Sequence, residues 1–259
     1  QANGSAVYTI KAGIPQECPV KACGRYYPER VDDVAWENDL TAFRAYGPAL
    51  QETGERAFGY DIWTKYNTTE PVVEARYEGE LNPDMKAKIA ELGKTDPKAA
   101  QELYRSVSYH VDHGNGLDCY KVGPTLGGGT TALMAGDTII YPYCYATQEI
   151  LDNGPLRFTV KLVYNPLVVK GDSTIIETRI ITLDAGSYCN KTVVSYTNLK
   201  ETMPLAVGIV LHEPDGAIVA DAANGYMTYV DPTDNAGGDN GKIFVGAAFP
   251  TLVKEAKAV

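Results

Sequence analysis

The sequence has no uninterrupted apolar run near the roughly 18 residues that a membrane-spanning helix requires. Basic side chains are also scarce, since 23 Lys and Arg stand against 33 Asp and Glu and give a formal net charge of -10. Nucleic acids and anionic membranes are bound through basic surfaces, so we expect neither as a partner. An anionic small substrate remains compatible with this charge, because it requires only a locally basic site.

Metal-binding cysteine pairs are absent as well. The five cysteines, Cys18, Cys23, Cys119, Cys144 and Cys189, include no CxxC pair and no zinc-type spacing. Cys18 and Cys23 could close a small loop in an oxidising compartment, although the odd count leaves at least one thiol over.

At 259 residues, 44% of them hydrophobic, the chain can bury a large core and needs no metal or disulfide to fold. We expect a single β-sandwich domain over residues 1–259. The first residues, Gln1 to Ala6, are small and polar rather than a signal peptide. We interpret the chain as an already processed form, and we expect a secreted protein, periplasmic or extracellular, whose signal peptide has been removed.

Tyrosine is abundant, with 18 residues against 5 Phe, and this bias suits β-sheets whose faces are partly wet. Apolar and polar residues alternate over the stretch from Leu156 to Tyr164, as in a half-buried strand. The same alternation recurs in Thr174–Leu183, Thr192–Tyr196, Leu205–Leu211, Ala217–Ala220 and Ile243–Ala247. The sequence therefore predicts a mainly β protein with antiparallel sheets arranged as a sandwich.

Residues 80–106 differ from this pattern. Asn82-Pro83-Asp84 and Thr95-Asp96-Pro97 are typical of helix starts, and few β-branched residues follow them. We predict a short two-helix insertion here and no other substantial helix. The glycine run at 127–129 precedes no GK[ST] motif, so we interpret it as a flexible turn rather than a phosphate-binding loop.

The densest polar cluster runs from Arg25 to Asp39 and continues through residues 42–48. It combines two cations, several carboxylates and Trp36 within fifteen positions. An aromatic ring with nearby acids and guanidinium groups is what a sugar hydroxyl or carboxylate requires. A solvated loop that carries ion pairs is an equally good interpretation of the same residues.

A second cluster, residues 109–123, holds two of the three histidines, His110 and His113. Histidine titrates near pH 6.5, so a histidine beside Tyr120 and Lys121 can transfer protons at about neutral pH. If the segment is extended, His110 lies on one face of the strand and His113 on the other.

A divalent metal on His110, Asp112 and His113 is conceivable, but the spacing matches no specific metal signature. We therefore assign no cofactor from the sequence and keep a divalent metal as an open alternative. The third histidine, His212, ends an apolar strand, where a hydrogen-bonded surface histidine is the expected state.

The sequence resembles a bacterial family known as domain of unknown function 4861, which is found among polysaccharide-utilisation genes. The matching runs are PERVDDVAWEND (28–39), AFRAYGP (42–48), DIW (61–63), YHVDHG (109–114), LD (117–118), YKVG (120–123), LDAGS (183–187) and NK (190–191). Together they cover most of the chain from Arg25 onward.

The resemblance implies carbohydrate chemistry on acidic oligosaccharides, pectin-like or ulvan-like, including removal of water from an oligosaccharide end. It also implies a β-supersandwich similar to galactose mutarotase, in which two large antiparallel sheets pack face to face and sugar binds on a concave sheet. The insertion at 80–106 departs from this pattern, as do Cys119 and Cys189.

Elimination from a uronate requires a base for a carbon-bound proton, an acid for the leaving oxygen and a cation near the carboxylate. We predict His110 or His113 as the base and Tyr120 as the acid or proton relay. The predicted carboxylate clamp is Arg30 or Lys121.

The predicted substrate-binding residues are Trp36, Glu37, Asp39, Arg44, Asp61, Trp63 and Asp112, with the two tryptophans as sugar platforms. A hydrolase would use two opposed carboxylates from Glu37, Asp39, Asp61 and Asp112. Hydrolase or epimerase activity on the same oligosaccharides, and glycan binding without catalysis, are therefore the alternatives to a lyase or dehydratase. The sequence leaves the oligomeric state open.

Neither polar cluster holds a complete set of catalytic groups alone. We therefore expect residues 25–44 and 109–121 to line one shared cleft, with both tryptophans, His110 and Lys121 facing it.

Overall fold

The computed structural model describes residues 4–14, 17–213, 216–234, 240–249 and 253–258. Strands account for 40% and helices for 17% of the fold. Every ladder between two named strands in this described part is antiparallel. The prediction of a mainly β, antiparallel sandwich is confirmed.

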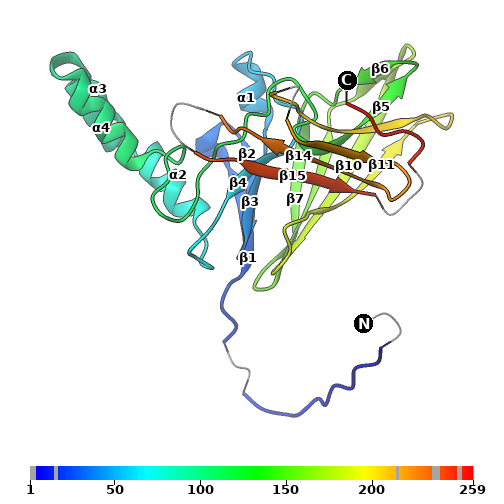
Figure 1. Cartoon of the computed structure of the whole chain (residues 1–259), viewed down its shortest axis with the longest axis horizontal. Coiled ribbons are helices and arrows are strands. Elements are labelled where there is room, and N and C mark those ends of the chain that lie inside the picture. The colour runs from blue at the N-terminus through cyan, green and yellow to red at the C-terminus, as the bar shows by residue number, and fades with distance from the viewer. Residues whose placement is uncertain (1–3, 15–16, 214–215, 235–239, 250–252, 259) are drawn as a thin grey trace.

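The strands of the described residues form four sheets (Figure 1). The first, in the order β1-β2-β3-β4, consists of β1 (Ala22–Tyr27), β2 (Asp33–Asn38), β3 (Thr41–Ala45) and β4 (Asp61–Thr64). The second, in the order β11-β10-β8-β7 with β9 beside β10, consists of β7 (Tyr145–Asn153), β8 (Arg157–Tyr164), β9 (Leu167–Val169), β10 (Asp172–Asp184) and β11 (Lys191–Thr197).

Two smaller sheets complete the β-structure. One has the order β12-β5-β6 and consists of β5 (Gly128–Ala135), β6 (Thr138–Ile140) and β12 (Leu205–Ile209). The other has the order β13-β14-β15 and consists of β13 (Ile218–Asp221), β14 (Tyr226–Asp231) and β15 (Ile243–Ala248). Residues 128–129 are thus the start of a strand, and the predicted flexible turn at 127–129 is wrong there.

The helices cluster between β4 and β5. They are α2 (Val73–Leu81), α3 (Pro83–Thr95) and α4 (Pro97–Val107), preceded by the short α1 (Pro48–Glu52) and the 3-10 turn η1 (Pro28–Arg30). Asn82 and Asp96 cap α3 and α4 by accepting bonds from Met85 and Ala99, so the predicted two-helix insertion is confirmed. The α3–α4 hairpin extends away from the sheets (Figure 1).

Helix α2 was not predicted, because its N-terminus is capped from a distant strand. The Glu37 carboxylate on β2 accepts the backbone N–H groups of Val72 and Val73 at 2.9 Å. These donors would otherwise lack a partner, and a negative charge at a helix N-terminus is favourable. A local sequence pattern contains no sign of a cap that lies 35 residues upstream.

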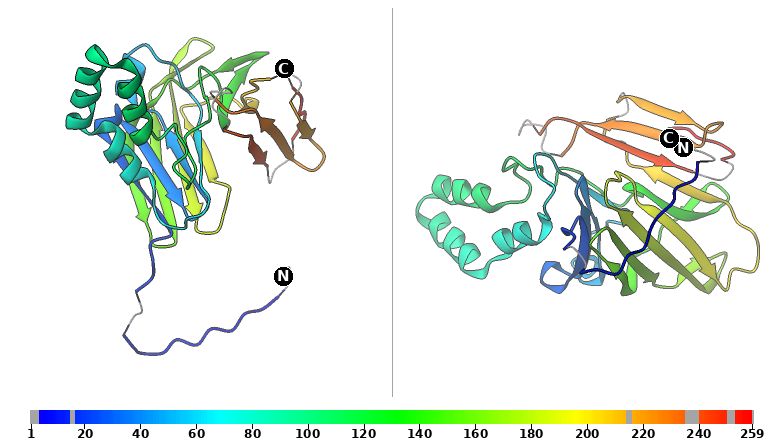
Figure 2. Two further views of the ribbon diagram at one scale, coloured as in Figure 1. Left: turned by 60° about the vertical axis from the view of Figure 1, so that its left-hand side comes forward. Right: turned by 90° about the horizontal axis from the view of Figure 1, so that it is seen from below.

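The main core lies between the first and second sheets. Trp36 and Phe43 from the first sheet stack on one another at 6.0 Å between ring centroids, and Trp36 stacks on Phe158 of the second at 6.2 Å. Leu162 and Ile181 of the second sheet are fully buried in the same cluster. Figure 2 shows the second sheet on one side of the first and the helices on the other.

Strands β2 and β3 are covered on both faces, which explains why their sequence does not alternate. Every residue of both strands is buried. On the face opposite the main core, Ala35 and Ala42 pack with Trp63, Tyr77 and neighbouring rings beneath α2. Charged residues also occur in β2 and β3. The sequence of this segment therefore has the composition of a polar cluster, although both strands lie in the interior.

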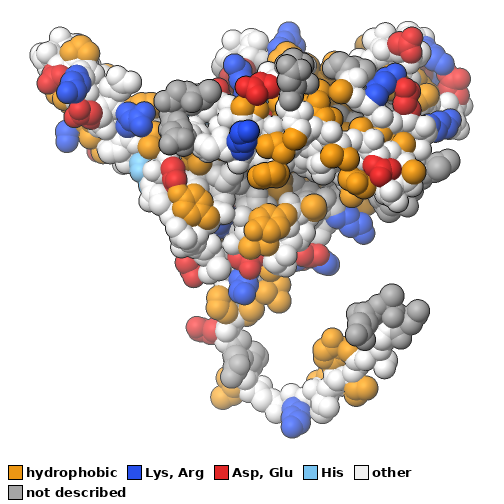
Figure 3. Space-filling model, in the orientation of Figure 1, with side chains coloured by type: hydrophobic (Ala, Val, Ile, Leu, Met, Phe, Trp, Pro, Cys, Tyr) orange, Lys and Arg blue, Asp and Glu red, His pale blue; other side chains and the backbone are white. Residues whose placement is uncertain are grey.

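The N-terminal segment carries apolar side chains in full contact with solvent. Val7, Tyr8, Ile10 and Ile14 are each at least 87% exposed, and Figure 3 shows hydrophobic side chains along this extended stretch. All five cysteines are free thiols, so the loop closure considered for Cys18 and Cys23 is not formed. Within the described residues, no helix has the length and apolarity that crossing a bilayer requires.

Replacing Trp36 with Ala tests the main core. We expect a loss of about 3–5 kcal/mol in the free energy of unfolding, because the indole is fully buried between two aromatic rings. Phe244→Ala is the matched control, since that ring is 81% exposed and should change stability by about 0.5 kcal/mol or less. Urea unfolding of both variants measures the difference, and equal losses would contradict this core.

Candidate functional site

A buried charge cluster lies on the face of the first sheet that is turned toward α2. It consists of Asp33 on β2, Arg44 on β3, Asp61 on β4, Asp118 from the loop after α4, and Arg30 at its edge. The first four are at most 3% exposed. We call this group the arginine cluster.

Arg44 occupies the centre of the arginine cluster. Its Nη2 donates to Asp61 and, at 2.8 Å, to Asp118, while its Nη1 lies 3.8 Å from Asp33. The Tyr46 hydroxyl accepts from the same Nη2 at 3.1 Å. A guanidinium with five donors in one plane can hold several carboxylates at once, which a lysine could not do.

The loop that carries Asp118 is fixed against the edge strand β4. Leu117 accepts the backbone N–H of Thr64 at 3.0 Å, and Asp118 forms an isolated antiparallel bridge with Trp63. Gly116 has φ +97, and a Cβ built there would lie 2.0 Å from the Thr64 carbonyl oxygen. Only glycine fits this position, and its approach brings Asp118 within reach of Arg44.

Backbone strain helps to place the other side of the cluster. Val31 and Asp32 adopt φ values of 45 and 65, which are costly for residues with a side chain, above all for a β-branched one. Asp32 accepts bonds from the Tyr26 hydroxyl and, at 3.2 Å, from the Ala49 backbone. The turn brings Arg30, which precedes it, and Asp33, which follows it, into the arginine cluster.

The arginine cluster contains three carboxyls and two guanidinium groups. Burial raises the pKa of Asp33 to about 7 and the pKa of Asp118 to about 7, because the charged forms are removed from water. Asp33 Oδ1 has no hydrogen-bond partner among the described residues. The cluster therefore takes up a proton near neutral pH, and that proton balances its charge.

His110 connects this buried cluster to solvent. Its Nδ1 lies 3.2 Å from the Asp118 carbonyl oxygen and 3.6 Å from the Asp118 carboxylate, while the side chain is 48% exposed. A carbonyl oxygen only accepts, so Nδ1 carries the proton and Nε2 presents its lone pair. No group in the described part of the chain hydrogen bonds to Nε2.

His110 lines a cavity of about 380 Å³, which we call the histidine pocket. Its wall brings together residues from β4, α4, the histidine loop and the segment before β15, namely Thr64, Tyr66, Arg105, His110, Val111, Asp112, Leu117, Asn240, Gly241 and Lys242. The Tyr66 hydroxyl donates to the Asp112 carboxylate, and this bond raises the pKa of Tyr66. Asp112 also accepts the backbone N–H groups of Gly114 and Gly116.

The two predicted segments meet, but not as the predicted cleft. Arg30 Nε donates to the Tyr109 hydroxyl at 3.0 Å, and Arg44 pairs with Asp118, so residues 25–44 and 109–121 are in contact. Their contact surface is interior. Only His110 and Asp112 of the predicted residues line the pocket that opens beside it.

The predicted sugar platforms Trp36 and Trp63 are wrong. Their side chains are 0% and 1% exposed, and they lie on opposite faces of the first sheet. Trp63 stacks on Tyr109 at 5.0 Å between centroids, and its indole N–H donates to Asp61. Both rings are core residues, because β2 is covered on the face to which Trp36 points and β4 on the face to which Trp63 points.

Several predicted polar residues are structural rather than accessible. Glu37 pairs with the buried ammonium of Lys65 at 2.7 Å besides capping α2, and Arg44 and Asp61 lie within the arginine cluster. Tyr120 is 4% exposed and donates its hydroxyl to the Gly127 carbonyl, so its assignment as catalytic acid is wrong.

The remaining predicted residues do not line the histidine pocket. Asp39 is partly exposed and accepts the Gly186 backbone N–H at 2.7 Å. Arg30 is held by Tyr109, and Lys121 is exposed. Neither cation lines the histidine pocket, so neither is in place there as a carboxylate clamp.

The other two histidines lie outside the histidine pocket and are hydrogen-bonded elsewhere. His113 Nε2 lies 2.9 Å from the Ser108 carbonyl oxygen, and because its ring does not line the pocket it is not placed as the base there. His212 Nδ1 lies 2.5 Å from Asp231 and its Nε2 lies 2.8 Å from the Lys121 carbonyl. The bond to Asp231 raises the pKa of His212, as expected for a hydrogen-bonded histidine.

The sequence did not identify three residues of the histidine pocket: Tyr66, Arg105 and Lys242. They come from a loop after β4, from the last turn of α4 and from the segment before β15, and no local motif links them. Among the described residues, no three His, Cys, Asp or Glu side chains form a group that could hold a metal ion. The alternative of a metal on His110, Asp112 and His113 therefore has no support in the described geometry.

Comparison with known proteins gives two matches. The model of the family described as "Domain of unknown function (DUF4861)" matches residues 1–258. The chain is 28% identical over 227 residues to "Uncharacterized protein P7" of Formosa agariphila, a match that covers 85% of this chain and 51% of that protein. The chain thus spans about half the length of this curated relative. No solved structure matches the chain.

The raised carboxyl pKa values in the arginine cluster predict how stability depends on pH. An unfolded aspartate titrates near pH 3.9, whereas Asp33 in the folded protein titrates at about 7. Between about pH 4 and 7 the folded state therefore holds a proton that the unfolded chain has released, so the free energy of unfolding falls as pH rises.

Asp33→Asn should reduce this fall, because an amide stays neutral across the whole interval. Urea unfolding at four values between about pH 5 and pH 8 measures the slope. Asp137→Asn, at an exposed position, is the control and should keep the wild-type slope. An unchanged slope in Asp33→Asn would show that this carboxyl is already ionised at pH 5.

Proposed function

The chain belongs to the DUF4861 family, and on this premise we propose that it is a carbohydrate-active lyase or dehydratase that acts on acidic, uronate-containing oligosaccharides in its histidine pocket. The family description states no activity, so the proposal depends on the site. The observation that carries it is the placement of His110: its ring lines the pocket and its Nδ1 lies 3.2 Å from the Asp118 carbonyl oxygen. That oxygen can only accept, so we assign the proton to Nδ1 and the lone pair to Nε2.

The charge of the pocket wall supports an anionic substrate. Arg105 and Lys242 line the same cavity as His110, although the chain as a whole has a net charge of -10. The one carboxylate in the lining, Asp112, is already bonded to Tyr66 and two backbone N–H groups. A carboxylate on the sugar therefore meets two cations and little repulsion.

The proposed step is an elimination. His110 Nε2 takes the proton from the carbon next to the sugar carboxylate, and the electron pair left behind forms a carbon–carbon double bond as the β carbon–oxygen bond breaks. Arg105 and Lys242 stabilise the charge that develops on the carboxylate. Tyr66 gives up its bond to Asp112, protonates the leaving oxygen and regains a proton from solvent, while His110 releases the abstracted proton to solvent; the raised pKa of Tyr66 keeps it protonated beforehand.

Asp118 positions the His110 ring, because both its carbonyl oxygen and its carboxyl lie near Nδ1. It receives a 2.8 Å bond from Arg44, and its carboxyl faces the same Nδ1 as its carbonyl oxygen. This pair holds the ring in one orientation and favours the imidazolium that forms when the proton is taken. Arg44 thus acts on the proposed chemistry through Asp118 and His110, as a positioning residue.

Hydrolysis has less support from the same geometry. Glu37 and Asp61 are at most 3% exposed and tied in ion pairs, so they are poorly placed as a pair of catalytic carboxylates. Epimerisation would share the proton abstraction by His110 and differ only in where the proton returns. Binding without catalysis would need the pocket but not the free Nε2.

His110→Ala tests the proposal. We expect turnover to fall by a factor of about 10² to 10⁴, with little change in the thermal midpoint, because the side chain is half exposed. Mass spectrometry of uronate-containing oligosaccharides after incubation is the measurement. Loss of one water indicates a dehydratase, and cleavage without uptake of water indicates a lyase.

His113→Ala is the matched control, since that ring lies in the same loop but bonds to Ser108 and does not line the pocket. It should retain turnover within a small factor. Uptake of one water per cleaved bond would identify a hydrolase instead. An unchanged oligosaccharide with wild-type protein, at concentrations where it binds, would identify a binding protein.

A further inference from the structure

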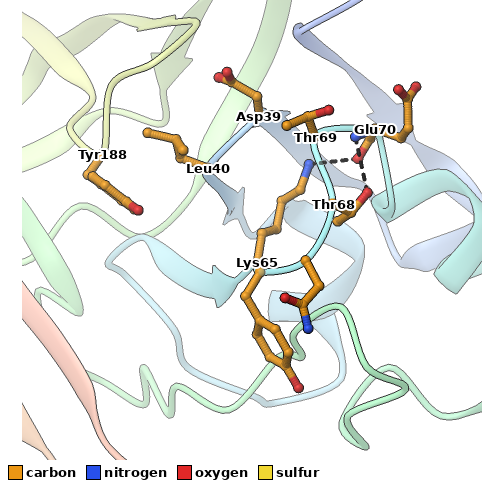
Figure 4. Close-up of a pocket in the computed structure, with 9 residues that line it drawn as sticks. Asp39, Leu40, Lys65, Thr68, Thr69, Glu70 and Tyr188 are labelled. Carbon is orange, nitrogen blue, oxygen red and sulfur yellow. Dashed lines mark hydrogen bonds between the residues drawn. The ribbon is translucent and has the colours of Figure 1, made fainter.

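A second, larger cavity of about 660 Å³ adjoins the histidine pocket. Figure 4 shows it between the β2–β3 turn, the loop after β4 and the loop that carries Tyr188. Its lining consists of Asp39, Leu40, Lys65, Tyr66, Asn67, Thr68, Thr69, Glu70 and Tyr188. We call it the tyrosine pocket, after Tyr188.

The only lysine in this lining is neutralised. The Lys65 ammonium is bonded to the Glu37 carboxylate at 2.7 Å and to the carbonyl oxygens of Asn38 and Glu70 at 2.6 and 2.9 Å. Its side chain is 1% exposed. Lys65 therefore has no donor left for a ligand, and it contributes a neutral surface to the tyrosine pocket.

The remaining groups are hydroxyls, an amide, two carboxylates, the Leu40 side chain and the exposed rings of Tyr66 and Tyr188. Tyr188 is 70% exposed, with no partner ring among the described residues, and Asp39 accepts only one backbone bond, from Gly186. Carboxylates would repel an acidic sugar but accept bonds from sugar hydroxyls, and an exposed ring packs against the C–H face of a pyranose. This chemistry fits a neutral sugar unit and disfavours a uronate.

The two pockets share a wall. Tyr66 lines both and is 42% exposed, so a ligand that fills the histidine pocket can continue past this ring into the tyrosine pocket. The walls differ in charge, since Arg105 and Lys242 line the first and no unpaired cation lines the second.

From these observations we propose that the tyrosine pocket is a second sugar subsite that takes a neutral unit, attached to the acidic unit in the histidine pocket. The inference rests on the proposed function for the identity of the acidic unit. It specifies the substrate further: an oligosaccharide in which a uronate is linked directly to a neutral sugar, with Tyr188 as the stacking platform.

Titration calorimetry with three probes tests the subsite. The probes are glucuronate alone and disaccharides of glucuronate with a neutral hexose, in both linkage orders. One linkage order should bind about tenfold more tightly than glucuronate, because it adds the stacking contact. Tyr188→Ala should remove this gain and change the affinity for glucuronate by less than about twofold.

Two variants separate stacking from other effects. Tyr188→Phe keeps the ring and should keep the gain in affinity, whereas a role of the hydroxyl alone would abolish it. Tyr226→Ala removes an exposed tyrosine on β14 that lines neither pocket and should behave as wild type.

The failures of the two proposals can be told apart by measuring binding and product mass on the same samples. A gain that depends on Tyr188 without any change in ligand mass supports the subsite and overturns the proposed reaction. Turnover with no affinity gain from the neutral unit, or with a gain that Tyr188→Ala preserves, overturns the subsite alone. Absence of binding by every probe overturns both.

Discussion

The arrangement of this protein depends on one buried guanidinium. Arg44 is 3% exposed and bonds to Asp61 on the neighbouring strand and to Asp118 in the loop after the helices. Removing a charge from water costs several kcal/mol, and only good geometry with several partners offsets it. The loop cannot leave the sheet without exposing or orphaning these charges, so Arg44 fixes where the loop lies.

The position of His110 follows from that constraint. Asp118 is held from inside the protein by Arg44 and faces His110 with both its carbonyl and its carboxylate. Gly116 permits the close approach of the loop to Thr64. The orientation of the His110 imidazole is therefore fixed by the buried arginine and by the close contact of Gly116 with the edge strand β4. Such preorganisation is what proton transfer requires.

Most of the fold could be predicted from the sequence, except helix α2, which is capped from a distant strand, and the strands that are covered on both faces. Strands with one wet face, such as β8 and β10, alternate in polarity and were recognised. Strands β2 and β3 are covered on both faces and hold Asp33 and Arg44 in the interior, so their charges suggested a surface loop. The candidate site was found in part, through His110 and Asp112, because the other pocket residues are distant in the chain and share no motif.

Residue type alone could not rank the histidines; their hydrogen bonds and their positions relative to the histidine pocket do. His212 has both nitrogens bonded, to Asp231 and to the Lys121 carbonyl, so it links three segments and has no lone pair to offer. His113 uses Nε2 on the Ser108 carbonyl. His110 is bonded only through Nδ1, to an acceptor, and this leaves a basic nitrogen beside two cations in a cavity. The same side chain is thus a structural tie, a loop contact or a candidate base according to how many of its nitrogens are bonded and whether its ring lines the pocket.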